Sequence, residues 1–346
     1  MLNLILSVSI PFLISLFLTP LMMFIARKKN IMDMPSGRKE HTEPVPLMGG
    51  VAIFIACVIS FILFSKSTAN YVLPILIIGA TSIAVMGLID DILSLSAKRR
   101  LAILFVVALI VFFGCLQFYL DTQHLIRGSA LGIIVFSFFI IVWIVGITNA
   151  INFSDGLDGL ASHLSGISAI SFAIIFAHQG RDMLALPMAL ALCGAIAGFI
   201  PYNRNPAMIF MGDSGSMFIG FILSLLSISS IRHESSLFAL IVPIYLLFVP
   251  IMDMGMSVLR RIVTGKPIMS PDKEHFHHQL NKRFSNHIAV VIILSLVQIL
   301  FSAVGIFVFI NKAFKLGVAV LAAVVLLFSI YTVISSLKAK RLGNGS

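Results

Sequence analysis

Charged side chains are scarce in this sequence. Acidic residues number 14 among 346, and all charged residues together make up 11% of the chain. A soluble domain of ordinary composition carries about 25% charged residues. Because 59% of the residues are hydrophobic and the mean hydropathy is +1.07, the composition excludes an ordinary soluble domain and indicates an integral membrane protein.

Cysteine is also rare, and Cys57, Cys115 and Cys193 each stand alone in or at the end of an apolar stretch. Such cysteines behave as small hydrophobic residues, and none has the spacing of a disulfide framework or a zinc site. The net charge of +10 comes from basic residues beside the apolar stretches. Membrane orientation and anionic lipid head groups account for them, so we expect no nucleic-acid partner.

Long apolar stretches, by contrast, are abundant. Windows of near-spanning length are typical of transmembrane helices, and they predict an all-α, polytopic membrane protein with about eleven transmembrane helices in one domain, residues 1–346. The windows at 164–177 and 217–231 are short enough to be re-entrant or buried. The eleven windows are Leu4–Ile25, Leu47–Phe64, Tyr71–Ile89, Leu101–Leu116, Leu131–Thr148, Leu164–Ala177, Leu184–Ile200, Met217–Ile231, Leu237–Leu259, Ile288–Ile310 and Leu316–Ser336.

The basic residues predict the orientation. If the amino terminus is outside and the carboxyl terminus is cytoplasmic, most of the 24 basic residues fall on the inner side, as the positive-inside rule requires. Arg27, Lys28 and Lys29 follow the first apolar window and nothing basic precedes it, so we expect an anchor and not a cleavable signal. The longer connections, at 26–46, 90–100, 149–163, 201–216 and 260–287, then all face the cytoplasm.

Acidic residues gather in four short polar motifs on this predicted cytoplasmic face. A membrane protein that collects carboxylates, amides and histidines on one face is expected to form a polar site there. The motifs are Asp90-Asp91, Asn149-Ala-Ile-Asn152-Phe-Ser-Asp155-Gly-Leu-Asp158-Gly, Met211-Gly-Asp213-Ser-Gly215 and Pro271-Asp-Lys-Glu-His275-Phe-His277-His278.

The first two motifs each allow two interpretations. Adjacent carboxylates at the carboxyl-terminal end of a helix are unfavourable, so Asp90 and Asp91 indicate compensation by a cation or by the basic run 98–100, unless they are solvated. The Asn and Asp residues of the second motif recur every three positions, which suits one helical face. The interleaved glycines favour a tight turn instead, holding a divalent metal, a ribose or a base edge, or serving only as a structural Asx-turn.

The remaining motifs are also open to alternatives. Asp213 or Ser214 is expected to act as an N-cap, or the turn binds an anion at a helix start. The histidines lie in a basic connection that suits a diphosphate better than zinc. Asp253 lies inside an apolar window that also contains Pro243 and Pro250, which predict a bend. It is a candidate functional residue or one half of a pair with a neighbouring helix.

Taken together, the motifs predict phosphoryl chemistry. Transfer of a phosphoryl group needs a divalent metal and cationic side chains to neutralise charge, and carboxylate and amide oxygens suit Mg²⁺. Grooves between apolar helices can accept a lipid chain. The residues therefore predict transfer of a phosphoryl-containing group from a cytoplasmic donor to a lipid acceptor.

The same motifs occur in the polyprenyl-phosphate N-acetylhexosamine-1-phosphate transferase family, which the sequence resembles nearly end to end. Within that family it is similar to the branch that uses UDP-N-acetylglucosamine (UDP-GlcNAc) and undecaprenyl phosphate. The resemblance is carried by Asp33-x-Pro35, Arg38-Lys39-x-His41, Pro46-x-Met-Gly49-Gly50, Asp90-Asp91 with Lys98, Asn149-Ala-Ile-Asn152-x-x-Asp155-Gly-Leu-Asp158-Gly-Leu-Ala161, Phe210-Met-Gly-Asp213-Ser-Gly215-Ser, and Ser270-Pro-Asp272 with His275-x-His277-His278.

This resemblance implies an eleven-helix fold, Mg²⁺ dependence with Mn²⁺ as a substitute, and a set of site residues. Asp213 and Asn152 are implied as metal ligands, and Asp90, Asp91 and Asp213 as catalytic residues near the lipid phosphate. The residues expected to bind the nucleotide, sugar and diphosphate are Lys98, Asn149, Asp155, Asp158, Arg261, His275, His277 and His278.

The implied reaction transfers GlcNAc-1-phosphate from UDP-GlcNAc to undecaprenyl phosphate and releases UMP, in a bacterial inner membrane with the site on the cytoplasmic face. The His-x-His-His pattern ranks transfer of phospho-MurNAc-pentapeptide, or of another N-acetylhexosamine phosphate, second. A cation-coupled transporter would carry its acids near the midplane and in both halves of the chain, and a non-catalytic scaffold leaves the Asn/Asp periodicity unexplained. Whether the chain forms a homodimer is left open.

Overall fold

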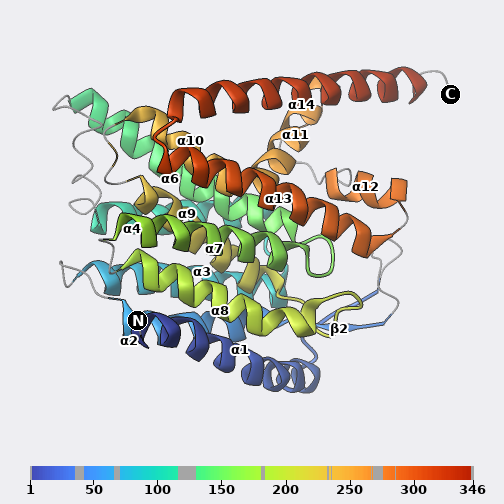
Figure 1. Ribbon diagram of the computed structural model, residues 1–346. Helices are drawn as coiled ribbons and strands as arrows, with labels where there is room; N and C mark the ends of the chain where they lie inside the picture. The colour runs from blue at the N-terminus through green and yellow to red at the C-terminus, as the bar shows by residue number, and fades with distance from the viewer. Residues whose placement is uncertain are drawn as a thin grey trace.

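The computed structural model is an all-α bundle with one small hairpin (Figure 1). It describes residues 2–35, 43–65, 71–115, 130–180, 184–231, 234, 236–265, 267, 276–284 and 286–343. The elements are α1 (Leu2–Lys29), β1 (Met32–Asp33), β2 (Val45–Pro46), α2 (Gly49–Phe64), α3 (Val72–Leu93), α4 (Ala97–Gly114), α6 (Ala130–Ser154), α7 (Leu160–Gln179), α8 (Ala185–Asn203), α9 (Gly212–Ser230), η1 (Leu237–Leu240), α10 (Ile241–Leu246), α11 (Phe248–Thr264), α12 (Phe276–Phe284), α13 (His287–Ile310) and α14 (Phe314–Gly343).

The predicted polytopic membrane fold is confirmed. Within the described residues, eight helices are long and apolar enough to cross a membrane, and α10 with α11 forms a broken ninth candidate. Helix α2 is apolar but shorter, with 16 residues. Each of the eleven predicted windows falls on a helix, while the number of crossings stays a prediction.

Helix α9 is the centre of the bundle, and 94% of its apolar window is buried. It packs against α2, α3, α6 and α7. Its sequence explains this position, because it is rich in serine and glycine, which let neighbouring helix backbones approach closely. The serine hydroxyls are satisfied locally: Ser224 and Ser227, for example, donate to the carbonyls of Phe221 and Ser224 at 2.6 Å each.

One end of the bundle carries the hairpin and α12, and the two chain termini lie at opposite ends (Figure 1). Strands β1 and β2 pair antiparallel, and the chain before α9 is tied to the same segment. Phe210 donates its backbone N–H to Pro46 at 2.9 Å and accepts from Gly49 at 3.0 Å. The start of α2 and the start of α9 are therefore fixed side by side.

Several helix ends differ from the predicted windows, and three of these differences fall at a polar motif. Helix α3 continues to Leu93, α6 continues to Ser154 and α9 begins at Gly212. Asp90, Asp91, Asn149 and Asn152 therefore lie on helices and not in connections. Low hydropathy ended the predicted windows early, but polar side chains that find partners inside the bundle allow a helix to continue.

The predicted bend occurs at Leu247, where α10 and α11 meet at 93°. Pro250 has no N–H, so the carbonyl of Leu246 loses its helical partner. Gln298 of α13 donates to that carbonyl at 2.9 Å and accepts from the Val249 N–H at 3.0 Å, and Ser168 donates to the same carbonyl at 2.6 Å. Side chains of two neighbouring helices thus replace the bonds lost at the break, as an apolar environment requires.

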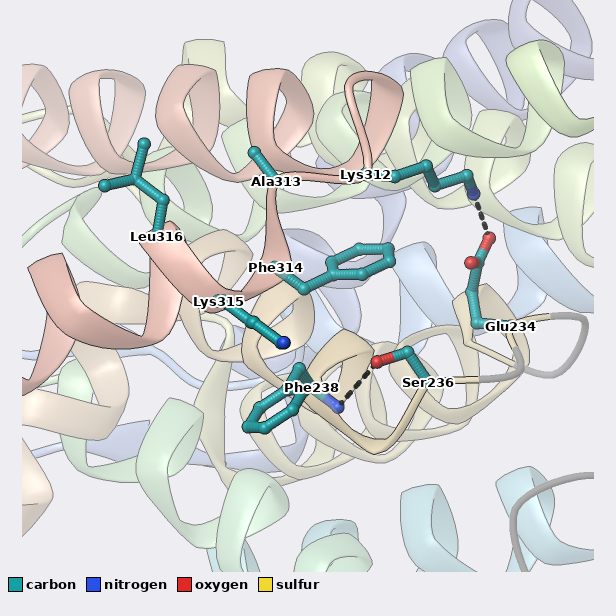
Figure 2. Close-up of a pocket in the computed structure, with 8 residues that line it drawn as sticks. All are labelled: Glu234, Ser236, Phe238, Lys312, Ala313, Phe314, Lys315 and Leu316. Atoms are coloured by element: carbon teal, nitrogen blue, oxygen red, sulfur yellow. Dashed lines mark hydrogen bonds and ion pairs between the residues drawn. The ribbon is translucent and has the colours of Figure 1, made fainter.

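At the opposite end of the bundle, Lys312 in the turn between α13 and α14 forms an ion pair with Glu234 (Figure 2). Lys312 has a φ of 54°, and its ammonium lies 4.4 Å from the ring centroid of Phe309. A cavity of about 520 Å³ lies beside this pair and is lined by Ser236, Phe238 and Lys315 among others. The pair links the last two helices to the segment that follows α9.

The break between α10 and α11 leads to a first prediction. Gln298→Met removes the side-chain hydrogen bonds to the Leu246 carbonyl and from the Val249 N–H. The carbonyl keeps Ser168, but the buried N–H loses its acceptor, so the change should lower the free energy of unfolding by ~2 kcal/mol. Thermal unfolding in detergent measures this change. The control Leu296→Met alters an exposed position of the same helix and should stay within about 0.5 kcal/mol of the parent protein. Equal midpoints for the two variants would contradict the proposed role of Gln298.

Candidate active site

Three of the four polar motifs meet where the carboxyl-terminal ends of α3 and α6 approach the amino-terminal end of α9. Asp90 and Asp91 lie in the last turns of α3, Asn152 in the last turn of α6 and Asp213 in the first turn of α9. Asn152 bonds the Asp213 carboxylate, Arg100 joins that carboxylate to Asp90, and Asp91 bonds the backbone at the start of α9. The predicted convergence of the catalytic and metal-binding candidates therefore holds for these four residues.

Arg100 of α4 lies between two of the carboxylates. Its Nη1 atom is 2.8 Å from Asp90 Oδ2 and 3.0 Å from Asp213 Oδ2. The Asp90 side chain is only 4% exposed, whereas those of Arg100 and Asp213 are 31% and 28% exposed. The other oxygen of Asp90 accepts the Leu95 N–H. Arg100 was expected only as one of three compensating cations in the basic run 98–100. Lys98, the cation of that run assigned to the site, is exposed on the first turn of α4.

Asp91 has a different partner, the amino terminus of α9. Its Oδ1 accepts the Asp213 N–H at 2.7 Å and its Oδ2 accepts the Ser214 N–H at 3.1 Å. Gly212 enters the helix at a φ of 69°, and a Cβ atom there would lie 2.6 Å from the Asp91 carboxylate. The expectation that Asp213 or Ser214 caps α9 is wrong, because the residue at the cap position, Met211, offers no side-chain bond. The acceptor comes from α3.

Asn152 orients the second oxygen of Asp213. Its amide nitrogen lies 2.6 Å from Asp213 Oδ1 and 2.9 Å from Ser216 Oγ. Asn149, three residues earlier on α6, donates to its own helix at the Val145 carbonyl, 2.8 Å away. The carboxylates of Asp90, Asp91, Asp155 and Asp213 are referred to below as the acidic centre. Only one of the two asparagines is bonded to it, although both are on the helix that the three-residue periodicity suggests.

The turn between α6 and α7 adds two more carboxylates. Burial raises the pKa of Asp155 well above its ordinary value, and repulsion from Asp213, Asp91 and Asp158 raises it further. Asp158 Oδ2 accepts from the Asn205 side chain and the Ala207 N–H, both at 3.0 Å. Asp158 therefore holds the connection between α8 and α9 in place.

A cavity of about 470 Å³ lies beside Asp158. Its walls come from the end of α1, the hairpin, the connection before α9 and the start of α13. The lining residues include Arg27, Pro46, Asp158, Phe210 and His287. The combination of an aromatic ring, a carboxylate and cationic or titratable side chains is suited to a polar ligand such as a nucleotide.

The remaining predicted substrate-binding residues belong to α11 and α12. Arg261 lies near the end of α11 and is partly buried. His277 and His278 lie in the first turn of α12, and His275 lies outside the described residues. The structure therefore gives the helices on which these residues stand, and their predicted contacts with a substrate stay predictions.

The acidic centre has the donor chemistry that Mg²⁺ requires. No group of three or more His, Cys, Asp or Glu side chains in the described part of the chain is arranged to hold a metal. Mg²⁺, however, is commonly held by one or two carboxylates together with substrate phosphates and water. Asp90 Oδ2 and Asp213 Oδ2 face one cationic position, now taken by the Arg100 guanidinium, so these residues fit the ion.

Close approach of α3 and α9 leads to a second prediction. A Cβ atom on Gly87 would lie 2.5 Å from the Asp213 carbonyl oxygen and from Ser214 Cα. Gly87→Ala should therefore push the two helices apart and cost ~1–3 kcal/mol of stability. Gly146→Ala on α6 is the matched control, since no atom lies within 4 Å of its added Cβ, and alanine is the better helix former. Thermal unfolding should move in opposite directions for the two variants; a shared direction would contradict the packing.

Comparison with known proteins identifies the family of this chain. Residues 73–231 match glycosyl transferase family 4, a stretch that contains the whole acidic centre. The chain is 38% identical over 303 residues to the probable undecaprenyl-phosphate N-acetylglucosaminyl 1-phosphate transferase of Bacillus subtilis, across 87% of this chain and 84% of that protein. It is 31% identical over 317 residues to the undecaprenyl-phosphate alpha-N-acetylglucosaminyl 1-phosphate transferase of Thermotoga maritima, across 92% and 94%.

A relative named for a different transferred group shows a comparable identity. The chain is 32% identical over 295 residues to the phospho-N-acetylmuramoyl-pentapeptide-transferase of Lactobacillus gasseri, across 78% of this chain and 90% of that protein. These relatives cover most of the chain, not only the site. The chain belongs to glycosyl transferase family 4, the family of polyprenyl-phosphate N-acetylhexosamine-1-phosphate transferases that its motifs resemble.

Proposed function

We propose that this protein transfers GlcNAc-1-phosphate from UDP-GlcNAc to undecaprenyl phosphate, which gives undecaprenyl-diphosphate-GlcNAc and UMP. The observation that carries the proposal is the cationic position shared by Asp90 and Asp213, where the end of α3 meets the start of α9. The names of the Bacillus and Thermotoga relatives support this donor and acceptor.

The membrane placement is part of the proposal. The chain crosses a bacterial inner membrane eleven times, with its amino terminus outside and its carboxyl terminus in the cytoplasm. Two observations support this: the eleven apolar windows all fall on helices, and the basic segment 27–29 lies at the same end of α1 as the hairpin. The acidic centre then faces the cytoplasm, where UDP-sugars are available.

The chemistry is a direct displacement. An oxygen of the lipid phosphate attacks the β-phosphorus of UDP-GlcNAc, a new P–O bond forms, and the bridging bond to the α-phosphate breaks to release UMP. The lipid phosphate needs no base, because a phosphate monoester has a second pKa near 6 and is mostly dianionic at pH 7. Both oxygens of Asp90 are engaged, by Leu95 and by Arg100, which supports a role in neutralising charge and not in removing a proton.

Mg²⁺ is the proposed cofactor, with Mn²⁺ as a substitute. Asp213 and Asn152 are its proposed protein contacts, and the Asp90 carboxylate shares the cationic position with Asp213. When bound, the ion neutralises charge on the transferring phosphoryl group and orients its oxygens. Asn152 holds Asp213 in position, and Asp91 holds the amino-terminal end of α9, so that the Asp213 carboxylate faces Asp90. Arg100 supplies a fixed positive charge beside the same carboxylates.

The donor diphosphate and sugar are assigned to basic and histidine residues of α4, α11 and the segment before and in α12. These are Lys98, Arg261, His275, His277 and His278. The nucleotide is assigned to the last turns of α6, with Asn149, and to the turn that follows, with Asp155 and Asp158. The cavity beside Asp158, with its aromatic and cationic walls, supports this assignment.

A second donor is favoured by one observation, the similarity to the Lactobacillus phospho-N-acetylmuramoyl-pentapeptide-transferase. Both reactions use the same displacement at a β-phosphorus and differ in the group transferred, which in the second carries a pentapeptide. A panel of UDP-N-acetylhexosamines and UDP-MurNAc-pentapeptide therefore distinguishes the two. A cation-coupled transporter would instead move its solute without consuming any UDP-sugar.

The central test is transfer of radiolabelled GlcNAc-1-phosphate from UDP-GlcNAc to undecaprenyl phosphate by purified protein in detergent. Mg²⁺-dependent label in the lipid phase, with release of UMP, is expected. Asp213→Asn should reduce the rate by at least ~100-fold, because it removes the negative charge that attracts the metal and pairs with Arg100. Glu234→Gln, the same change at the other end of the bundle, should leave the rate within about twofold. Near-normal activity of Asp213→Asn would exclude this residue from the metal site.

A separate prediction concerns Arg100 and needs no activity. Arg100→Met leaves Asp90 and Asp213 without their shared cation, so the variant should be less stable than the parent in chelator. Since a ligand that binds only the folded state stabilises it, Mg²⁺ should raise the unfolding temperature of the variant more than that of the parent. Arg99→Met, an exposed change one residue away, should behave like the parent. If Mg²⁺ stabilises none of the three proteins, the carboxylates do not form the metal site.

A further inference from the structure

Asp253 is a buried carboxylate inside α11, with 5% of its surface exposed. An ionisable side chain within an apolar helix has a specific partner or function as a rule. Its Oδ1 accepts the backbone N–H of Phe276 at 2.7 Å. Phe276 is the first residue of α12, so Asp253 reaches from one helix to the start of another, and it plays no part in the acidic centre described above.

Helix α12 needs such a partner because it is short. It contains nine residues, and helices of that length are marginal in water without tertiary contacts. The first N–H groups of a helix have no partner within the helix. A carboxylate at that end satisfies one of them and also interacts favourably with the helix dipole. Asp253 therefore stabilises α12 and fixes the residue at which it begins.

The side chain of Phe276 makes a second contact that holds the start of α12. The ring of Phe276 meets Phe328 of α14 edge to face, with centroids 6.3 Å apart. Phe328 in turn meets Phe248 at the start of α11, with centroids 6.4 Å apart, and Phe248 stacks on Phe301 of α13. The first residue of α12 is thus held through its backbone by α11 and through its ring by α14.

The segment of α11 that precedes Asp253 is held in place by polar contacts. Asp253 follows the break at Leu247 by less than two helical turns, and Gln298 and Ser168 hold the backbone at that break. The direction of α11 is therefore determined by polar contacts with α13 and α7. Because α11 carries Asp253, the same contacts determine where α12 starts. His277 and His278 are the next two residues of α12.

We infer that Asp253 is a positioning residue, which places the histidines of α12 for binding of the donor diphosphate by capping that helix from α11. This inference rests on the proposed function for its kinetic consequence only. The cap itself is a property of the fold and can be tested without any substrate.

Amide hydrogen exchange tests the cap directly. In Asp253→Leu, the amides of α12 should exchange roughly fivefold faster or more, as expected for loss of an N-cap acceptor, while those of α10 and α13 stay unchanged. Asp253→Asn keeps an acceptor oxygen of the same length, and α12 should retain most of its protection. Asp253→Ser, whose side chain is too short to reach Phe276, serves if the leucine variant does not fold. Unchanged exchange in α12 for both Asp253→Leu and Asp253→Ser would overturn the inference.

Kinetics tests the consequence for the substrate. The KM for UDP-GlcNAc should rise roughly fivefold or more in Asp253→Leu, while the KM for undecaprenyl phosphate stays within about twofold. Asp253→Asn should be within about threefold of the parent for both. In a protein that already carries His277→Ala and His278→Ala, Asp253→Leu should add little further loss, because it acts through those residues.

The possible outcomes separate the two proposals. Faster exchange in α12 without any transferase activity in the parent protein would retain the cap and refute the proposed function. Activity in the parent, with equal losses in the KM of both substrates or losses that add to those of the histidine variants, would refute positioning through α12. A general loss of protection across α10, α11 and α13 in Asp253→Ser would reduce Asp253 to a residue required for folding.

Discussion

The contact between the end of α3 and the start of α9 is the constraint on which the site depends. Because α9 is buried almost throughout, water cannot satisfy its first N–H groups, and another helix must supply the acceptor. Asp91 does so, and its negative carboxylate also interacts favourably with the positive, amino-terminal end of the α9 dipole. The same bond sets the distance between α3 and α9. The bond between the Asp91 carboxylate and the backbone of α9 therefore holds Asp213 opposite Asp90, without using the side chain of Asp213 or of Asp90.

Charge is distributed unevenly around this contact, and that distribution would allow one site to hold both the proposed metal and the phosphates. Asp90, Asp91, Asp155 and Asp213 form an acidic centre, in which Arg100 bridges two of the four. Such a centre attracts a divalent cation and repels a phosphate. The basic residues of α4 and α11 that are proposed to bind the donor would attract its anionic diphosphate. A metal bound at the centre would remove the repulsion, so donor and metal are expected to bind cooperatively.

The sequence predicted the helices well, because apolar length is a local property that each window carries by itself. It also predicted that Asp90, Asp91, Asn152 and Asp213 meet, since helix ends on one face of a membrane lie in the same layer and therefore close to one another. It did not predict their pairing. Asp91 as the cap of α9 and Arg100 as the bridge depend on how three helices pack, and no spacing within one segment contains that information. For the same reason, Asp213 was mistaken for a possible cap of its own helix.

Gln298 was not recognised at all, although a physical signal for it exists in the sequence. Pro250 leaves the Leu246 carbonyl without a helical partner, and in an apolar environment that carbonyl must find a donor. A lone amide side chain in a long apolar helix, as Gln298 is in α13, is the kind of residue that can provide it. The two signals lie 48 positions apart, so neither one is interpretable alone. Matching each helix-breaking proline with an isolated polar residue elsewhere would have predicted the α10–α11 break and its support together.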